Sequence, residues 1–110
     1  MDCVISESQP KHLSPKGSSL DIRAFYFEIS RMPLLLVSAA RKSGSAIERN
    51  KFRRRARMAF LTVLRRCPEL SGIGFVFWIR PTRGSPKGCR VDYWEIEKQM
   101  ESSLGRMRHQ

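Results

Sequence analysis

Residues 38–66 read SAARKSGSAIERNKFRRRARMAFLTVLRR, and this stretch decides both the fold and the charge of the chain. It contains 10 of the 21 Lys and Arg residues and a single acid, Glu48, so its net charge is +9 out of +11 for the whole chain. The other 81 residues carry only +2. We therefore expect this stretch to decide which partner the protein binds.

The spacing of residue types predicts one long helix that begins after Ser45 and ends near Arg66. Ser45 and Glu48 are spaced as a capping box, with the serine as N-cap and the glutamate at the third helical position. Arg65 and Arg66 suit the negative end of the helix dipole, and Pro68 stops the helix. Apolar residues recur every three or four positions and form one face: Phe52, Ala56, Ala59, Phe60, Val63 and Leu64.

The cations of this helix lie mainly away from its apolar face. At roughly 100° per residue, the far side holds Asn50, Arg53, Arg54 and Arg57. Lys51 and Arg55 flank the apolar face, and Arg49 lies in the first turn, where free backbone N–H groups favour an anion. A solvated surface is the ordinary alternative for a charge run, but such surfaces mix both signs. The pattern therefore favours a nucleic acid as partner.

Length and composition limit what else the chain can be. Its 110 residues make one domain with a modest core. The sequence shows neither an apolar run of about 18 residues nor a secretory signal, so we expect a cytoplasmic protein without a membrane span. Cys3, Cys67 and Cys89 are widely spaced and form no Cys-x-x-Cys pair. We therefore predict free thiols and no metal site.

Three segments have the pattern of strands: residues 22–30, 34–40 and 74–80. In the first, alternation places Phe25 and Phe27 on one face and Tyr26 on the other. The second, LLLVSAA, is apolar on both faces, which is typical of a central strand.

The remaining segments complete the predicted domain. Residues 1–20 are polar and contain two prolines, which predicts a mobile leader before a single domain over 21–110. Residues 81–89 form a loop, Asp92 caps a second helix and Gly105 ends it. The apolar stripe of that helix consists of Tyr93, Ile96, Met100 and Leu104. Strand, strand, helix, strand, helix predicts an α+β two-layer sandwich, and base rates favour a right-handed crossover.

The basic stretch resembles the signature of the bacterial ribonuclease P protein component family. The matching residues are Ser38, Arg41, Lys42, Gly44, Ala46, Arg49, Asn50, Lys51, Phe52, Arg53, Arg54, Ala56, Arg57, Ala59 and Phe60. Two positions depart from the signature: Lys51 replaces the usual arginine, and Phe52 replaces the usual aliphatic residue. Lys51 keeps the charge but lacks the planar fork that binds a phosphate through two hydrogen bonds.

The resemblance implies a small mixed sheet with helices and a left-handed crossover. It implies that RNA binds to Arg41, Lys42, Arg49, Asn50, Lys51, Arg53, Arg54 and Arg57. The partners would be ribonuclease P RNA and precursor tRNA, and the free protein would be a monomer. Catalysis would reside in the RNA with its Mg²⁺ ions, and the sequence shows no catalytic residues of its own. Members of the family begin with a basic amphipathic helix, which residues 1–20 do not show.

The resemblance also implies a cleft for the 5′ leader beside the first strand, where single-stranded RNA stacks on aromatic rings. The candidates are Phe25, Tyr26 and Phe27. The alternative is that Phe25 and Phe27 are core residues below the basic helix, in which case Tyr26 would be the better leader contact. Trp78 and Trp94 are interpreted as core or rim residues.

Four other functions remain to be weighed. A non-catalytic RNA- or ribosome-binding module of similar fold fits the charge, but the Arg-Asn signature favours the ribonuclease P subunit. A DNA-binding protein would need a helix-turn-helix or a zipper, and neither is visible. A membrane-surface helix would leave its apolar face free, whereas strands are available here to cover it. A protein nuclease would need a cluster of acidic or metal-binding residues.

Overall fold

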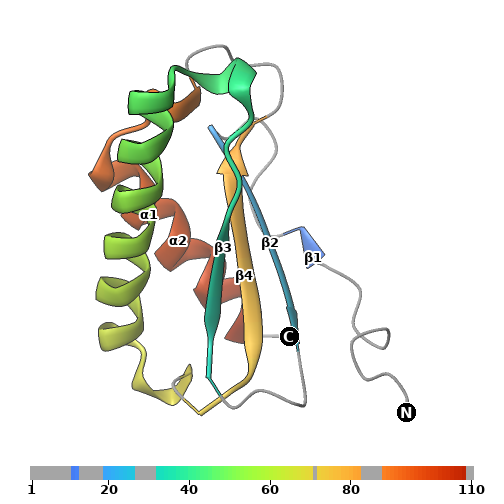
Figure 1. Cartoon of the computed structure of the whole chain (residues 1–110). Helices are drawn as coiled ribbons and strands as arrows, with labels where there is room; N and C mark the ends of the chain where they lie inside the picture. The colour runs from blue at the N-terminus through green and yellow to red at the C-terminus, as the bar shows by residue number, and fades with distance from the viewer. Residues whose placement is uncertain (1–10, 13–18, 27–31, 71, 83–87, 109–110) are drawn as a thin grey trace.

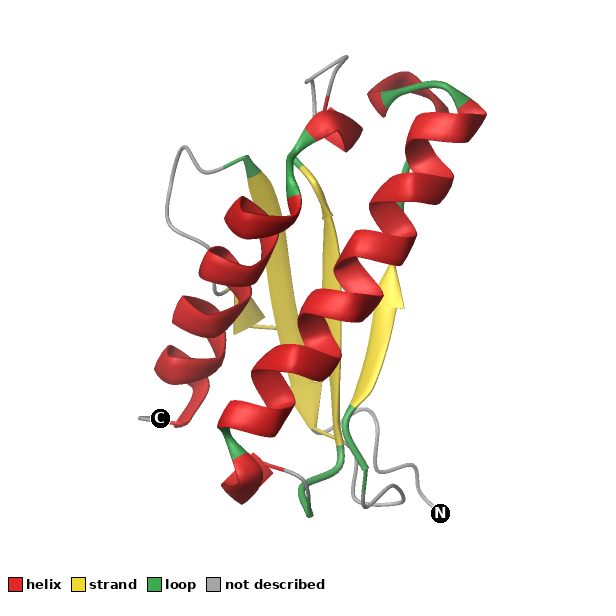
Figure 2. Ribbon diagram, turned by 90° about the vertical axis from the view of Figure 1, so that its left-hand side faces the viewer, coloured by secondary structure: helices red, strands yellow, loops and turns green. Residues whose placement is uncertain are grey.

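The described part of the chain forms two layers, a sheet and two α-helices that cover one of its faces (Figures 1 and 2). In this computed structural model the described residues are 11–12, 19–26, 32–70, 72–82 and 88–108. The strands and α-helices are β1 (Lys11–His12), β2 (Leu20–Tyr26), β3 (Leu34–Val37), α1 (Ala46–Arg66), β4 (Phe75–Pro81) and α2 (Tyr93–Arg108). Three short 3-10 turns are η2 (Arg41–Ser43), η3 (Pro68–Leu70) and η4 (Gly88–Arg90).

The sheet is mixed, with strand order β1-β2-β4-β3. β4 pairs antiparallel with β2 and parallel with β3, and the short β1 pairs with the outer edge of β2. This arrangement confirms the predicted α+β sandwich. In Figure 2 the helices lie in front of the sheet and β4 lies to the left of β3, so the β3–α1–β4 crossover is left-handed. The resemblance implied this hand, and base rates opposed it.

Alternation along the strands decides which residues enter the core between the two layers. Alternate residues of β2 and β4 are buried below the helices: Leu20, Ile22, Ala24, Phe75, Phe77 and Ile79. The predicted apolar faces of both helices cover them and are buried too: Phe52, Ala56, Ala59, Phe60, Val63, Ile96, Met100 and Leu104. The rings of Phe60 and Phe77 stack with centroids 5.8 Å apart, which ties α1 to the middle of the sheet.

Two strand predictions need correction. β3 is an edge strand of the described sheet rather than a central one, and its outward residues Leu34 and Leu36 are 49% and 47% exposed. β3 also ends at Val37 rather than at residue 40. β2 begins at Leu20, a buried core residue, and strand structure in β1 reaches into the segment for which no regular structure was predicted.

The helix predictions hold at three of four ends. α1 begins after Ser45 and ends before Cys67, which is buried at its C-cap as its apolar neighbours require. α2 begins after Asp92, whose Oδ1 accepts a hydrogen bond of 2.9 Å from the backbone N–H of Glu95. It does not end at Gly105 but continues to Arg108. Burial of Leu104 in the last turns outweighs the modest cost of a glycine inside a helix.

Candidate nucleic-acid interface

The first turn of α1 is fixed by the capping box that the sequence predicts. The backbone N–H of Glu48 donates to Ser45 Oγ over 3.2 Å, and the backbone N–H of Ser45 donates to Glu48 Oε1 over 2.9 Å. Arg90 of η4 donates from Nε to Glu48 Oε2 over 2.5 Å. The hydrogen bond from the Ser45 backbone and then that from Arg90 lower the pKa of Glu48 below its ordinary 4.5. The one acid of the basic stretch is thus already occupied.

Two arginines of α1 are held by residues from the C-terminal part of the chain. Arg55 donates from Nη2 to the carbonyl oxygen of Cys89 over 2.7 Å. Arg66 contacts Glu101 at 2.8 Å and Glu97 at 3.2 Å, and these carboxylates raise the pKa of its guanidinium. The two arginines on the side of α1 that faces α2 and η4 therefore already have partners within the protein.

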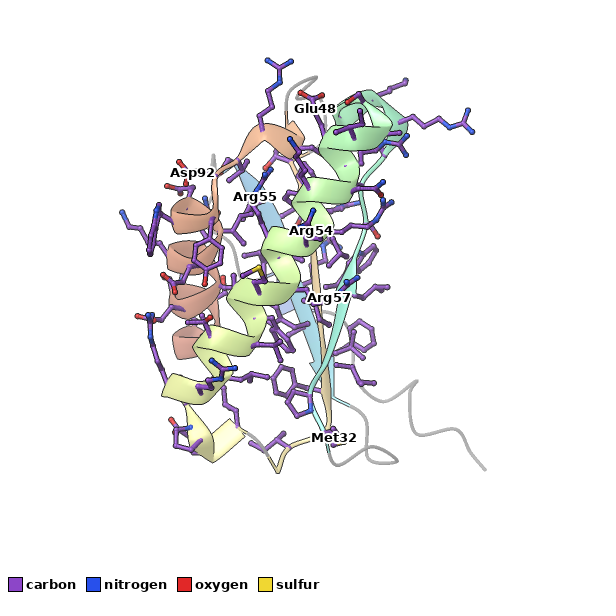
Figure 3. All side chains as sticks on the ribbon, turned by 60° about the vertical axis from the view of Figure 1, so that its left-hand side comes forward. Met32, Glu48, Arg54, Arg55, Arg57 and Asp92 are labelled. Atoms are coloured by element: carbon purple, nitrogen blue, oxygen red, sulfur yellow. The ribbon has the colours of Figure 1, made fainter. Side chains whose placement is uncertain are left out.

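The other cations of the stretch are left to solvent. Six of them are exposed and have no hydrogen-bond or ion-pair partner among the residues that the structure describes: Arg41, Lys42, Lys51, Arg54, Arg57 and Arg65. Figure 3 shows Arg55 on the α2 side of the helix, Arg57 on the β3 side and Arg54 pointing outward between them. The unpaired charge therefore occupies the outer and β3-facing sides of α1 and the turn η2.

Three further predicted RNA-binding residues differ in how accessible they are. Arg53 donates from Nη1 to Asn50 Oδ1 over 3.2 Å, so the Asn50 amide nitrogen is left to donate outward. Arg49 is half-buried, and its Nε is enclosed without a hydrogen-bond partner. Of the predicted set, Arg49 is thus less available to a phosphate than Arg54 or Arg57.

The sheet face away from the helices, here called the uncovered sheet face, carries charged, aromatic and aliphatic side chains. No helix of the described residues covers it (Figure 1). Its residues are Asp21, Arg23 and Phe25 of β2, Val76, Trp78 and Arg80 of β4, and Leu34 and Leu36 of β3. The strand register pairs them into rows, one of which runs Phe25, Val76, Leu34 and another Arg23, Trp78, Leu36.

Trp78 is fixed in this face by its neighbours, although sequence reasoning treated it as a core or rim residue. Its indole Nε1 donates to Ser38 Oγ over 2.9 Å, and the Arg80 guanidinium carbon lies 5.3 Å from its ring centroid. Arg80 is held in turn by Asp21, with Nη2 2.7 Å from Oδ2. Strand alternation could have predicted the position of Trp78: Phe77 and Ile79 on either side of it face the core, so Trp78 faces the opposite side of the sheet.

The three predicted leader contacts have different outcomes. Phe25 lies on the uncovered sheet face and is half-buried, so the alternative that it is a core residue is wrong. The backbone of Tyr26 ends β2 opposite Phe75, but its side chain lies outside the described residues. Phe27 also lies outside the described residues. Among the described side chains, the aromatic residues on this face are thus Phe25 and Trp78.

The described residues show neither a metal-binding cluster nor a helix that could span a membrane. They contain no group of three His, Cys, Asp or Glu side chains that could hold a metal ion. No helix among them is long and apolar enough to cross a membrane.

The fold and the one-sided charge define a small basic protein of the α+β two-layer class, with its exposed cations gathered on one long helix. The profile of the family described as Ribonuclease P matches residues 13–108, and the chain belongs to this family. A comparison of this chain with curated protein sequences found no match.

Solved structures with the same fold include RNase P proteins from Thermotoga maritima and Staphylococcus aureus. The chain is 21% identical to the RNase P protein from Thermotoga maritima in complex with 1-(4-fluorophenyl)-2-thiourea. The match covers 94% of this chain and 89% of that one, with a TM-score of 0.64. It is 13% identical to the Staphylococcus aureus RNase P protein, covering 96% and 85% of the two chains, with a TM-score of 0.64. At these identities the structures support the fold.

Proposed function

We propose that this chain is the protein subunit of a ribonuclease P holoenzyme and assists removal of the 5′ leader from precursor tRNA. It would bind the catalytic RNA through α1 and η2. The observation that carries the proposal is the uneven pairing of charge on α1. Glu97, Glu101 and the Cys89 carbonyl bind Arg66 and Arg55 on one side, whereas Arg54, Arg57 and Lys51 have no partner among the described residues on the other sides.

The chemistry of the exposed groups suits folded RNA. A-form RNA hides its major groove, so a protein contacts it through phosphates, 2′-hydroxyls and shape. Arginine forks match phosphate oxygens, and the free amide of Asn50 can donate to a ribose or a base edge. About six phosphate contacts would make the logarithm of affinity fall with the logarithm of salt concentration with a slope of roughly −5.

The uncovered sheet face is our proposed site for the leader. Single-stranded RNA binds where aromatic rings stack on bases beside cations that follow the backbone. Phe25 and Trp78 supply rings on adjacent strands. Arg23, opposite Trp78 on β2, and Arg80, two residues after Trp78 on β4, supply cations, and both also contact Asp21. Tyr26 and Phe27 remain candidates from the sequence.

The proposal leaves the reaction itself to the RNA. Magnesium ions held by that RNA would stabilise the charge that develops during phosphodiester hydrolysis. The residues of this chain would contribute binding and orientation of the substrate. They would also place cations beside phosphates that must approach one another in the folded RNA.

Reconstitution tests the proposal. The full chain is mixed with a bacterial ribonuclease P RNA, and leader removal from precursor tRNA is measured at low Mg²⁺. We expect wild type and the Lys98→Ala control to restore cleavage and Arg53→Ala/Arg57→Ala to abolish it. Lys98 is an exposed cation of α2, outside the proposed interface. If wild type binds RNA with steep salt dependence but restores no cleavage, the chain is instead an RNA-binding module without this role.

A further inference from the structure

The outermost line of α1 combines exposed apolar residues with cations that have no partner in the described part of the chain. Residues spaced by four and three positions follow one another along the helix and lie on one side of it: Ile47, Lys51, Arg54, Met58, Leu61 and Arg65. Ile47, Met58 and Leu61 are 68%, 61% and 53% exposed, although they belong to the longest helix of the described residues. We call this line the outer ridge.

The outer ridge has cations toward both ends and an uncharged middle. Lys51 and Arg54 lie on one side of Met58 and Leu61, and Arg65 lies on the other. At 1.5 Å per residue, Arg54 and Arg65 are roughly 16 Å apart along the helix. The ridge contains no acid and no aromatic residue. A surface of this kind suits a ligand that carries negative charge near both ends of the ridge and less charge between them.

We propose that the outer ridge binds a base-paired segment of RNA, with its shallow minor groove seated on Met58 and Leu61. In A-form RNA this groove is wide and presents riboses and base edges between two phosphate strands. A convex helix surface fits such a groove, whereas a single strand needs stacking rings, and the ridge has none. The inference rests on the proposed function. It deepens that function by adding Met58, Leu61 and Arg65, which are not among the signature residues, and by naming paired RNA as their ligand.

Two other occupants fit the ridge less well. A second copy of the chain would bring Lys51, Arg54 and Arg65 against the same cations of its partner. A membrane surface favours a continuous apolar face. On α1 that face, which includes Phe52 and Val63, is buried against the sheet.

The test compares binding of a fully paired RNA hairpin and of an unpaired oligonucleotide of equal length. Met58→Gln/Leu61→Gln removes apolar surface without changing charge. We expect it to weaken hairpin binding about tenfold and to leave the salt slope and oligonucleotide binding unchanged. Arg65→Gln should reduce the salt slope by about one. The matched controls Trp94→Gln and Lys98→Gln change an exposed tryptophan and an exposed cation of α2, and should have neither effect.

Other outcomes overturn the inference in separate ways. If Arg53→Ala/Arg57→Ala weakens hairpin binding but the ridge variants do not, the ridge inference fails and the proposed function stands. If none of these variants weakens binding, both fail. If Met58→Gln/Leu61→Gln abolishes binding to phosphatidylglycerol vesicles, or self-association in sedimentation, while hairpin binding is unchanged, the ridge serves a membrane or a second copy. Thermal unfolding of each variant shows that the fold is intact.

Discussion

Arg90 and Glu48 join the start of α1 to the turn that precedes α2: the arginine Nε lies 2.5 Å from the carboxylate Oε2, across 42 positions of sequence. Glu48 also completes the capping box of α1. One carboxylate thus fixes the direction in which the basic helix leaves β3 and the position of η4 beside it.

Glu48→Gln should lower the melting temperature at pH 7, and the difference from wild type should shrink in acid. Glutamine can still accept the Ser45 backbone hydrogen bond, but it loses the charged bond to Arg90. Because the folded pKa of Glu48 is lowered, its stabilisation is present above the ordinary value of 4.5 and is lost as pH falls through the folded pKa. Thermal unfolding followed by circular dichroism between pH 7 and pH 3 measures this.

Ser45→Ala is the contrasting variant for that experiment. It removes the side-chain acceptor of the cap, which costs about 1 kcal/mol. This loss should depend on pH less than that of Glu48→Gln, because the Ser45 side chain is the smallest of the causes that lower the pKa of Glu48. A difference between Glu48→Gln and wild type that stayed constant down to pH 3 would show that the charge of Glu48 contributes nothing.

Arg54 and Arg55 are neighbours in sequence, but replacing Arg55 should affect stability whereas replacing Arg54 should affect RNA binding. Arg55→Ala leaves the Cys89 carbonyl without its donor and should cost about 1–3 kcal/mol of stability, with the salt slope of RNA binding unchanged. Arg54 is exposed and has no partner among the described residues. Arg54→Ala should therefore keep the melting temperature and reduce the salt slope by about one. Equal effects of the two variants on the slope would contradict this division of the helix.

The long helix could be predicted because its signals are local. The cap at Ser45, the apolar repeat through Phe52 and Val63, and Pro68 lie within a single segment, and each agrees with the others. The direction of Arg54 and Arg57 away from the core followed from the same repeat. The repeat could not show which cations have partners within the protein, because the partner of Arg55 comes from η4, a distant segment.

The uncovered sheet face could not be predicted because it depends on pairing between distant strands. Leu36 lies beside Trp78 only because β3 and β4 pair in parallel register. Before that pairing is known, a segment apolar on both faces is typical of a central strand, and β3 in fact lies at the edge with one apolar face outward. The same lack of register left Phe25 undecided between core and surface.

Gly105→Ala should stabilise the protein. Gly105 lies inside α2, and a Cβ added there meets no atom within 4 Å. Alanine is favoured over glycine inside a helix by about 0.5–1 kcal/mol. Chemical unfolding should therefore show a higher midpoint. A lower midpoint would mean that Gly105 ends the helix in a left-handed conformation, as the sequence suggested.

Gly88→Ala should destabilise the fold at η4, the turn that contains Arg90 and whose Cys89 carbonyl binds Arg55. A Cβ at Gly88 would lie 2.6 Å from Pro81 Cβ, and a proline ring cannot move aside as a flexible side chain can. Forcing extra volume into a packed site costs about 1–3 kcal/mol. Gly72→Ala is the matched control, because an added Cβ there meets nothing within 4 Å. A loss of stability no larger than that of the control would rule out tight packing between η4 and β4.

Trp78→Leu should weaken the recognition of precursor tRNA only when the substrate carries a leader. Leucine keeps an apolar side chain in the row between Arg23 and Leu36 but removes the ring on which a base would stack, a loss of about 1–3 kcal/mol. Ser38→Ala removes the hydroxyl that accepts from the Trp78 indole and should have a smaller effect in the same direction. Affinities of the reconstituted holoenzyme for precursor tRNA and for mature tRNA measure the difference. Trp94→Leu, on the exposed side of α2, controls for loss of a tryptophan as such. If Trp78→Leu weakened both substrates equally, the uncovered sheet face would contact the tRNA body or the catalytic RNA rather than the leader.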